Sequence, residues 1–327
     1  MYAIENHKVS ESARAHTHLD DATYQRMYRQ SLEQPDQFWA EQAERFLTWD
    51  KRWSKVHESD LSKGQAAWFI DGKLNVSVNC IDRHLAEHGD EIAGIIMEPI
   101  NYNQGCIVAS PEYMQFVRDI ATDNHITLIY DEVLSAFRTG PDCGQGYYGV
   151  SPDVCVIGKA VANGAPIAVI AGKKELMDQV GPGGEVAQSG TYSGNTIGVL
   201  AALATLEEIS KPGFYDPIYQ AADRLYTGLT DLLARAGIPA RVQGLGARFG
   251  ILFGVTEPVT RFEDTFKYDA AVADSFMRAC AGRGVYFHSY GTLVVGHHGI
   301  SAAHSLADID EALNRIESAL GDLNPGR

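Results

Sequence analysis

Short apolar runs alternate with amphipathic helical stretches along the chain from about residue 91 onward. Runs with the length and composition of buried strands occur at residues 92–97, 127–130, 154–157 and 167–171. Between the first two runs, residues 111–124 repeat their apolar side chains with helical spacing. Strands separated by helices predict an α/β fold with a mostly parallel sheet and helices on both faces.

A second pattern follows a long Ala- and Leu-rich helix that we predict at residues 196–209. Lys211-Pro212-Gly213 ends this helix. Beyond it the periodicity predicts a smaller α+β domain, with helices at 214–236, 268–283 and 305–320 and strands near 241–242, 248–255 and 293–296. We therefore expect one domain at residues 94–211 and another at residues 212–327.

Residues 1–93 differ from the rest and predict a mainly helical segment. Asp20 or Asp21 is placed to cap a helix that runs through Leu32. Pro35 is placed to open a second helix, because proline suits the first helical turn.

Two weaker signals complete this N-terminal segment. Asp71-Gly72 predicts a hairpin turn between residues 68–70 and 74–76. A short helix is expected at residues 80–88, with Ser77 or Asn79 as its cap and Gly89 at its end.

Composition limits the classes of partner and compartment. The chain has 327 residues, enough for two or three domains, and a formal net charge of −15. That charge argues against nucleic acid or an anionic membrane as partner, because both attract basic surfaces. No apolar run approaches the roughly 18 residues of a membrane span, and no secretory leader is evident. The five cysteines form no CxxC pair, so we expect reduced thiols and a cytoplasmic location.

Two charged residues each stand at the carboxyl end of a predicted strand. Asp131 ends the apolar run at 127–130, and Lys159 follows the run at 154–157. Ligands of α/β sheets bind beyond the carboxyl ends of the strands, so both groups are offered to one crevice. An amine that can form a Schiff base and a carboxylate that can pair with a pyridinium nitrogen suit pyridoxal phosphate. Taken singly, an aspartate after a strand is more often a loop start or a helix cap, and a lysine there is more often a solvated surface residue.

Several stretches around this pair resemble one enzyme family. The sequence from residue 91 to 327 resembles the second half of a class III pyridoxal-phosphate aminotransferase, of the glutamate-1-semialdehyde 2,1-aminomutase and ω-transaminase type. The stretches that carry the resemblance are Met97-Glu-Pro-Ile100, Tyr130-Asp-Glu-Val133, Phe137-Arg138, Ile157-Gly-Lys159, Gly190-Thr-Tyr-Ser-Gly-Asn195 and Ala303-His304. The resemblance implies a partial fold-type-I transferase.

The same resemblance implies roles for individual residues. Lys159 would be the Schiff-base lysine and Asp131 the partner of the pyridinium nitrogen. Val133 would pack on the cofactor ring, and Asn103 would hydrogen-bond its phenolic oxygen. Gly190-Thr191 would reach the phosphate of the partner subunit in a homodimer. The implied reaction is amino-group transfer between a small amino acid or amine and a keto acid or aldehyde, of transaminase or aminomutase type.

The N-terminal segment resembles a different family. Residues 20–93 resemble the N-terminal region of an acetyl-CoA or propionyl-CoA synthetase, in stretches such as Trp68-Phe-Ile-Asp-Gly-Lys-Leu-Asn75. The part of an aminotransferase that cradles the cofactor phosphate is not recognisable there. We therefore expect a chimeric chain joined near residues 89–93. An inactive remnant and an acyl-CoA synthetase fragment remain as alternatives. His288, His297, His298 and His304 lack the ligand spacing of a metal site, so no metal is expected.

Overall fold

The chain forms two compact units, Met1–Ile92 and Ala93–Arg327, in a computed structural model. The structure describes residues 11, 14, 17–60, 65–75, 78–88, 91–288 and 295–323. Each unit is taken by itself below. The predicted boundary at residues 211 and 212 stays a prediction.

Two predicted helices open the first unit. Helix α2 (Asp21–Glu33) begins after Asp20, whose Oδ1 accepts a hydrogen bond from the backbone N–H of Thr23 at 2.7 Å. Helix α3 (Pro35–Phe46) has Pro35 in its first turn. The chain then forms an antiparallel pair of strands, β1 (Lys55–Asp60) and β2 (Gln65–Ile70).

The predicted hairpin at Asp71-Gly72 is wrong, because β2 pairs with the strand that precedes it. The N–H of Gly72 donates to the carbonyl of Phe69, so the chain does turn here. Lys73 forms only an isolated antiparallel bridge with Lys51. A Cβ on Gly72 would lie 2.7 Å from the ring of Trp49, which packs over the turn. Strand β1 was missed because its residues are mostly charged or polar and carry no apolar period.

The short helix predicted at 80–88 begins two residues earlier than expected. A π-helical turn, η2 (Val78–Asp82), leads into α4 (Arg83–His88). Asn79 is buried within this turn. Its side chain accepts from the N–H of Thr48 at 2.6 Å and donates to the Thr48 carbonyl at 2.8 Å, which ties the turn to the loop after α3. Ser77 and Gly89 lie outside the described residues.

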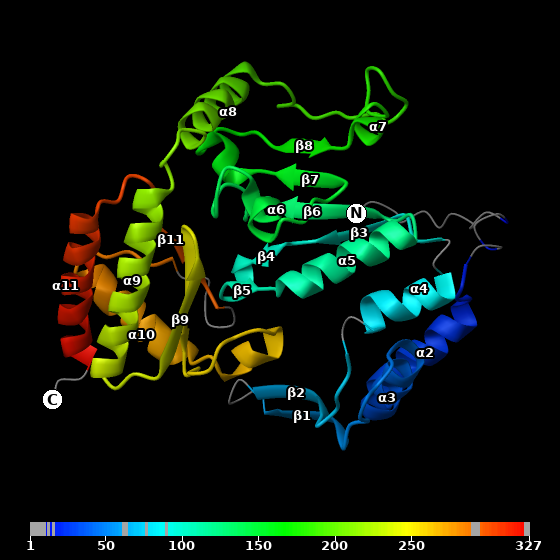
Figure 1. Cartoon of the computed structure of the whole chain (residues 1–327). Helices are drawn as coiled ribbons and strands as arrows, with labels where there is room; N and C mark the ends of the chain where they lie inside the picture. The colour runs from blue at the N-terminus through cyan, green and yellow to red at the C-terminus, as the bar shows by residue number, and fades with distance from the viewer. Residues whose placement is uncertain are drawn as a thin grey trace, which may run out of the picture. The chain divides into compact units, whose positions relative to one another are not determined.

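A four-stranded sheet organises the first part of the second unit. Its strands lie in the order β3 (Gly94–Met97), β6 (Thr127–Glu132), β7 (Val154–Ile157) and β8 (Val169–Gly172) (Figure 1). The first three are parallel, and β8 runs antiparallel to β7. The prediction of a mostly parallel α/β sheet is confirmed.

The two faces of this sheet have different surroundings. Leu128 and Tyr130 of β6 are fully buried on the face along which α5 (Pro111–Asp123) runs (Figure 1). The opposite face carries Ile96 of β3, which is 66% exposed, and Ile170 of β8, which is 55% exposed. Asp131 lies on this second face, because residues alternate along a strand.

Short elements and one long helix surround the sheet. They are β4 (Ile100–Asn101), η4 (Tyr102–Gln104), β5 (Ile107–Val108), α6 (Cys143–Tyr148), η5 (Lys159–Ala162), α7 (Lys174–Met177) and α8 (Thr196–Ile209). Helix α8 has the predicted bounds, and the side chain of Asn195 caps it. In the part of the chain that the structure describes, every helix is too short or too polar to cross a membrane.

The C-terminal part of this unit is a three-stranded antiparallel sheet with helices against it. The strands are β9 (Ala240–Leu245), β10 (Arg248–Phe253) and β11 (His297–Gly299), and the helices are α9 (Asp216–Arg235), α10 (Ala270–Gly282) and α11 (Leu306–Leu323), with η6 (Phe262–Lys267) before α10. The helices lie together beside the sheet (Figure 1) and share one apolar core with it. The strand predicted at 293–296 falls partly outside the described residues; β11 follows it.

The turn η4 attaches the two parts of the second unit to each other. Tyr102 is fully buried, and its hydroxyl donates to the carbonyl of Leu245 at 2.9 Å. Gln243 of β9 donates to the carbonyls of Gly105 and Cys106 at 3.1 and 3.0 Å. These bonds fix η4 against the smaller sheet, close to the strand ends that carry the predicted site.

Candidate active site

Strand register brings Asp131 and Lys159 to the same edge of the sheet. Asp131 of β6 pairs with Val156 of β7, and Lys159 begins the turn η5, with Gly158 between it and that strand. Asp131 is half-buried and Lys159 is exposed. The backbone of Lys159 has φ +44°, a conformation that is uncommon for a residue with a side chain. The fold thus holds this lysine in a specific orientation at some conformational cost.

Val133 connects the two charged residues. Its backbone N–H donates to Oδ1 of Asp131 at 3.0 Å, which restricts the orientation of the carboxylate. Its side chain packs beside Gly158, where an added Cβ would lie 3.3 Å from Val133 Cγ1. The sequence-predicted residues Asp131, Val133 and Lys159 are therefore neighbours.

Glu98 also belongs to this group, and our reading of the sequence assigned it no role. It is half-buried, one residue beyond the end of β3. Burial raises the pKa of the Glu98 carboxyl group, and the nearby charge of Asp131 raises it further, whereas Asn103 and Lys159 act to lower it. Oε2 of Glu98 is buried and has no hydrogen-bond partner among the described residues. The signal in the sequence was its place after an apolar strand, the same as that of Asp131.

Asn103 is the fourth predicted residue in this neighbourhood. It lies on η4, is exposed, and interacts with Glu98 through its side-chain amide. Since η4 is fixed against β9 by Tyr102 and Gln243, the position of Asn103 depends on the smaller sheet. An amine, a carboxylate, a second carboxyl group and an amide therefore converge beyond the carboxyl ends of β3, β6 and β7.

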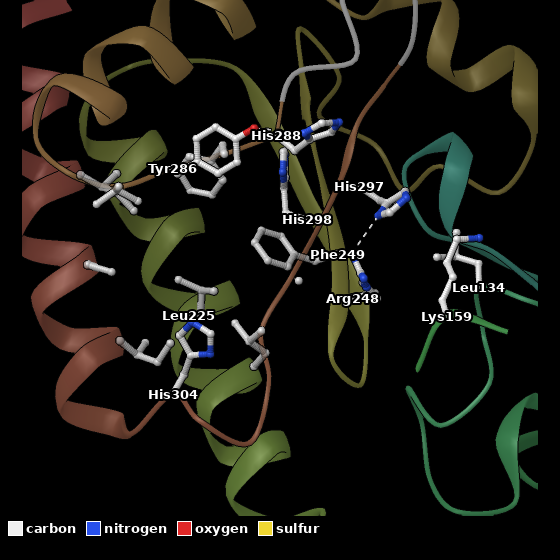
Figure 2. A pocket seen from close by; sticks show the side chains of 17 residues that line it. Leu134, Lys159, Leu225, Arg248, Phe249, Tyr286, His288, His297, His298 and His304 are labelled. Atoms are coloured by element: carbon white, nitrogen blue, oxygen red, sulfur yellow. Dashed lines mark hydrogen bonds between the residues drawn. The ribbon is translucent and has the colours of Figure 1, made fainter. Parts of the chain in front are cut away.

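A cavity of about 530 Å³ opens beside Lys159. Figure 2 shows Lys159 and Leu134 on one side of it, facing Arg248 and His297 of the smaller sheet. Arg248 Nη1 lies 3.2 Å from His297 Nδ1. Because a guanidinium group only donates, Nδ1 of His297 accepts and its Nε2 carries the proton.

The charges around this cavity are mostly positive. Burial lowers the pKa of His297 to about 4, and Arg248, Lys159, Arg138 and His288 act in the same direction. Burial, followed by the charge of Arg248, lowers the pKa of Arg138 to about 10. A neutral His297 with two guanidinium groups and an amine nearby gives a wall that suits an anionic substrate group.

His298 points to the other side of β11 from His297 and is buried, and it also lines part of the cavity. Burial lowers its pKa to about 3, with His297 and His288 contributing. Its ring lies 5.4 Å from that of Phe249 and 5.0 Å from that of Phe287. Neither ring nitrogen has a hydrogen-bond partner among the described groups. Among the residues that the structure describes, no three His, Cys, Asp or Glu side chains come together as metal ligands.

Gly190 and Thr191 do not join this group within one chain. Both are exposed and line a separate hollow with Pro166, Ile167 and Tyr192. The predicted contact of Thr191 with the phosphate in a partner subunit stays a prediction.

Comparison with known protein families gives two matches. The sequence profile of the class-III aminotransferases, described as "Aminotransferase class-III", matches residues 62–320. The chain belongs to this family. A second profile, "Acetyl-coenzyme A synthetase N-terminus", matches residues 24–80. The predicted fusion of a segment from the second family to a class III aminotransferase is therefore confirmed, with an overlap of the two matches at residues 62–80.

Curated relatives agree with the family. Glutamate-1-semialdehyde 2,1-aminomutase 2 from Exiguobacterium sibiricum is 33% identical over 267 residues, which cover 80% of this chain and 60% of the relative. The protein of the same name from an Exiguobacterium species is 34% identical over 239 residues, covering 72% of this chain and 54% of that protein. The chain thus spans little more than half the length of these relatives.

Solved structures share the fold. An ω-transaminase from Sphaerobacter thermophilus has a TM-score of 0.66 at 24% identity. This match covers 81% of the present chain and 63% of the transaminase. A β-phenylalanine aminotransferase from Variovorax paradoxus has a TM-score of 0.64 at 26% identity. This match covers 75% of the present chain and 55% of the aminotransferase. The prediction of a partial fold-type-I transferase is confirmed.

Proposed function

We propose that this class III aminotransferase chain carries out amino-group transfer with pyridoxal phosphate. The substrates would be a small amino acid or amine and a keto acid or aldehyde. The observation that carries the proposal is the convergence of the Lys159 amine and the Asp131 carboxylate at adjacent strand ends. An amine and a carboxylate at adjacent strand ends offer the two groups that the cofactor requires from a protein.

The residues present fit the cofactor at its ring. Val133 already packs against Gly158, where an added Cβ would lie 3.3 Å from Val133 Cγ1, and the buried Oε2 of Glu98 has no hydrogen-bond partner among the described residues. Lys159 would bind the cofactor aldehyde, Asp131 would pair with the ring nitrogen, and Asn103 would donate to the phenolic oxygen. When bound, pyridoxal phosphate supplies a protonated ring that stabilises negative charge at the substrate carbon.

The remaining steps depend on groups of the chain itself. The Lys159 amine, on the exposed side of η5, would accept a proton from the substrate carbon and return it. Arg248 and His297 form the facing wall and would orient a substrate carboxylate there. The Val133 N–H keeps the Asp131 carboxylate in place throughout. The matched relatives include aminomutases and transaminases, so either outcome for the amino group fits.

We also propose that the chain acts as a homodimer in which Gly190 and Thr191 contact the cofactor phosphate of the partner subunit. Support comes from α8, which follows this loop and has exposed apolar side chains along it. We place the domain that carries the cofactor residues at 94–211 and the smaller one at 212–327. The five cysteines are free thiols, four of them buried, which suits the reducing cytoplasm.

One labelling experiment tests this function. The chain is incubated with pyridoxal phosphate, its visible absorbance is recorded, and borohydride is added to fix any lysine-bound cofactor. Mass spectrometry of peptides is expected to find the label on Lys159 and to lose it in Lys159→Ala. A label that survives in Lys159→Ala contradicts the assignment. An unlabelled chain at saturating cofactor favours the inactive remnant. ATP-dependent formation of an acyl adenylate would instead favour the synthetase fragment.

A further inference from the structure

The register of β3 and β6 places Glu98 beside Asp131. Met97 pairs with Tyr130 in the parallel ladder, so Glu98 and Asp131 are the next residues on adjacent strands. Neighbouring strands lie about 4.8 Å apart, and residues in register point to the same side of a sheet. Two carboxyl groups therefore stand side by side at the same edge as Lys159.

The surroundings of the two carboxyl groups are unequal. Asp131 receives the Val133 N–H at 3.0 Å, so one of its oxygens already has a backbone donor. Oε2 of Glu98 receives no hydrogen bond among the described residues and is buried. The charged groups that face Glu98 are Asp131 of β6 and Lys159 of η5, and Asn103 of η4 adds a neutral amide.

Two adjacent carboxyl groups do not both ionise readily when one is desolvated. A buried, ionised oxygen without a donor bears the full desolvation penalty of a charged group. A protonated carboxyl group avoids this cost, because it carries its own donor and can direct it to the neighbouring carboxylate. Asp131 already has a backbone donor, so the proton belongs on Glu98.

We propose that Glu98 is a positioning residue that carries a proton at neutral pH and directs it toward Asp131. The proposal rests on the proposed function for its purpose, because a neutral Glu98 leaves Asp131, of these two groups, as the anion available to the cofactor ring nitrogen. An ionised Glu98 would place a second negative charge beside that of Asp131. It would also compete with Asp131 for the positive charge of the Lys159 amine. Glu98 thereby fixes which carboxyl group pairs with the cofactor.

A titration of the cofactor-free chain tests the proposal. Glutamate side-chain carboxyl carbons are labelled with ¹³C and followed by NMR between pH 4 and 9, and Glu98→Gln identifies the Glu98 signal. Glu98 is expected to stay protonated at pH values where the exposed glutamates have lost their protons. In Asp131→Asn its proton affinity should fall about tenfold, since the like charge is gone.

Lys159→Ala provides the opposite control, because removal of the amine should increase the proton affinity of Glu98. The two opposite shifts identify the same signal even if Glu98→Gln does not fold. A Glu98 signal that titrates with the exposed glutamates would overturn the proposal. A signal whose titration is the same in wild type, Asp131→Asn and Lys159→Ala would also overturn it. The titration is done without cofactor, so its result does not depend on the borohydride labelling. A failure of the proposal for Glu98 can therefore be distinguished from a failure of the proposed function.

Discussion

The backbone N–H of Val133 donates to Oδ1 of Asp131 at 3.0 Å, where the chain leaves β6. This bond holds the carboxylate on the exposed side of the sheet without using its second oxygen. The loop therefore orients Asp131 before any ligand binds, and the orientation depends on an oxygen atom rather than on a charge.

Asp131→Asn separates the accepting oxygen atom of this side chain from its negative charge. The amide oxygen can still accept from Val133, so the free energy of unfolding should change by less than about 0.5 kcal/mol. The negative charge is lost, and affinity for pyridoxal phosphate should fall about 10- to 100-fold, as expected for a charged hydrogen bond. Spectroscopic titration with the cofactor measures this. Equal affinities in the two proteins would remove Asp131 from the site.

Gly250 tests how η4 is held against the smaller sheet. A Cβ on Gly250 would lie 2.8 Å from Cα of Gly105, a backbone contact that cannot relax by side-chain rotation. Gly250→Ala should destabilise the chain by roughly 1–3 kcal/mol. It should also weaken cofactor binding, since the displaced turn carries Asn103. Gly140→Ala is the matched control, because an added Cβ meets nothing within 4 Å there. Denaturant unfolding of both variants should separate them.

Glu132 follows Asp131 but has a structural task. It is fully buried and accepts from the hydroxyl of Ser135 and the N–H groups of Gly144 and Gln145, at 2.8–3.1 Å. Glu132→Ala would leave these donors unsatisfied, so the free energy of unfolding should fall by about 3 kcal/mol or more. Glu132→Gln keeps an acceptor and should lose less. Equal stability of wild type and Glu132→Ala would show that water replaces the carboxylate.

The sequence predicted the strands and helices of the second unit well because their periodicity is strong. Residues 154–157 and 196–209 have the predicted bounds. Asp131 and Lys159 could be placed together because both follow apolar strands. Glu98 follows a strand too, but it lies near Asp131 only because β3 pairs with β6. The order of the strands along the chain does not predict that pairing. Arg248 and His297 could not be found either, because their approach to Lys159 depends on how η4 docks onto β9.

The two buried histidines of β11 predict a loss of stability in mild acid. The pKa of His297 is about 4 and that of His298 about 3 in the folded chain, both below the unfolded value near 6.5. Between pH 6.5 and these values the unfolded chain binds more protons. The free energy of unfolding should therefore fall as pH decreases, by up to roughly 1.4 kcal/mol per pH unit for each histidine.

Substitutions check the origin of this acid sensitivity. His298→Phe suits the aromatic surroundings of Phe249 and Phe287, and His297→Gln keeps a polar group beside Arg248. Each should flatten the dependence of unfolding free energy on pH between 7 and 5. His18→Gln, at an exposed position, should leave the slope unchanged. If the variant with both His297→Gln and His298→Phe keeps the same dependence of unfolding free energy on pH, other groups cause the acid sensitivity.

Helix α8 predicts self-association of the chain. Ile197, Leu200 and Leu203 are 74%, 59% and 51% exposed, although α8 is an apolar helix. Exposed apolar side chains gathered on one element are typical of an interface. Leu200→Asp would place a charge among them and should weaken association at least tenfold, measured by sedimentation equilibrium. Glu207→Gln, at an exposed polar position of the same helix, should not. If Leu200→Asp and wild type associate equally, α8 is not the interface, and the proposed contact of Thr191 with a partner subunit loses its structural support.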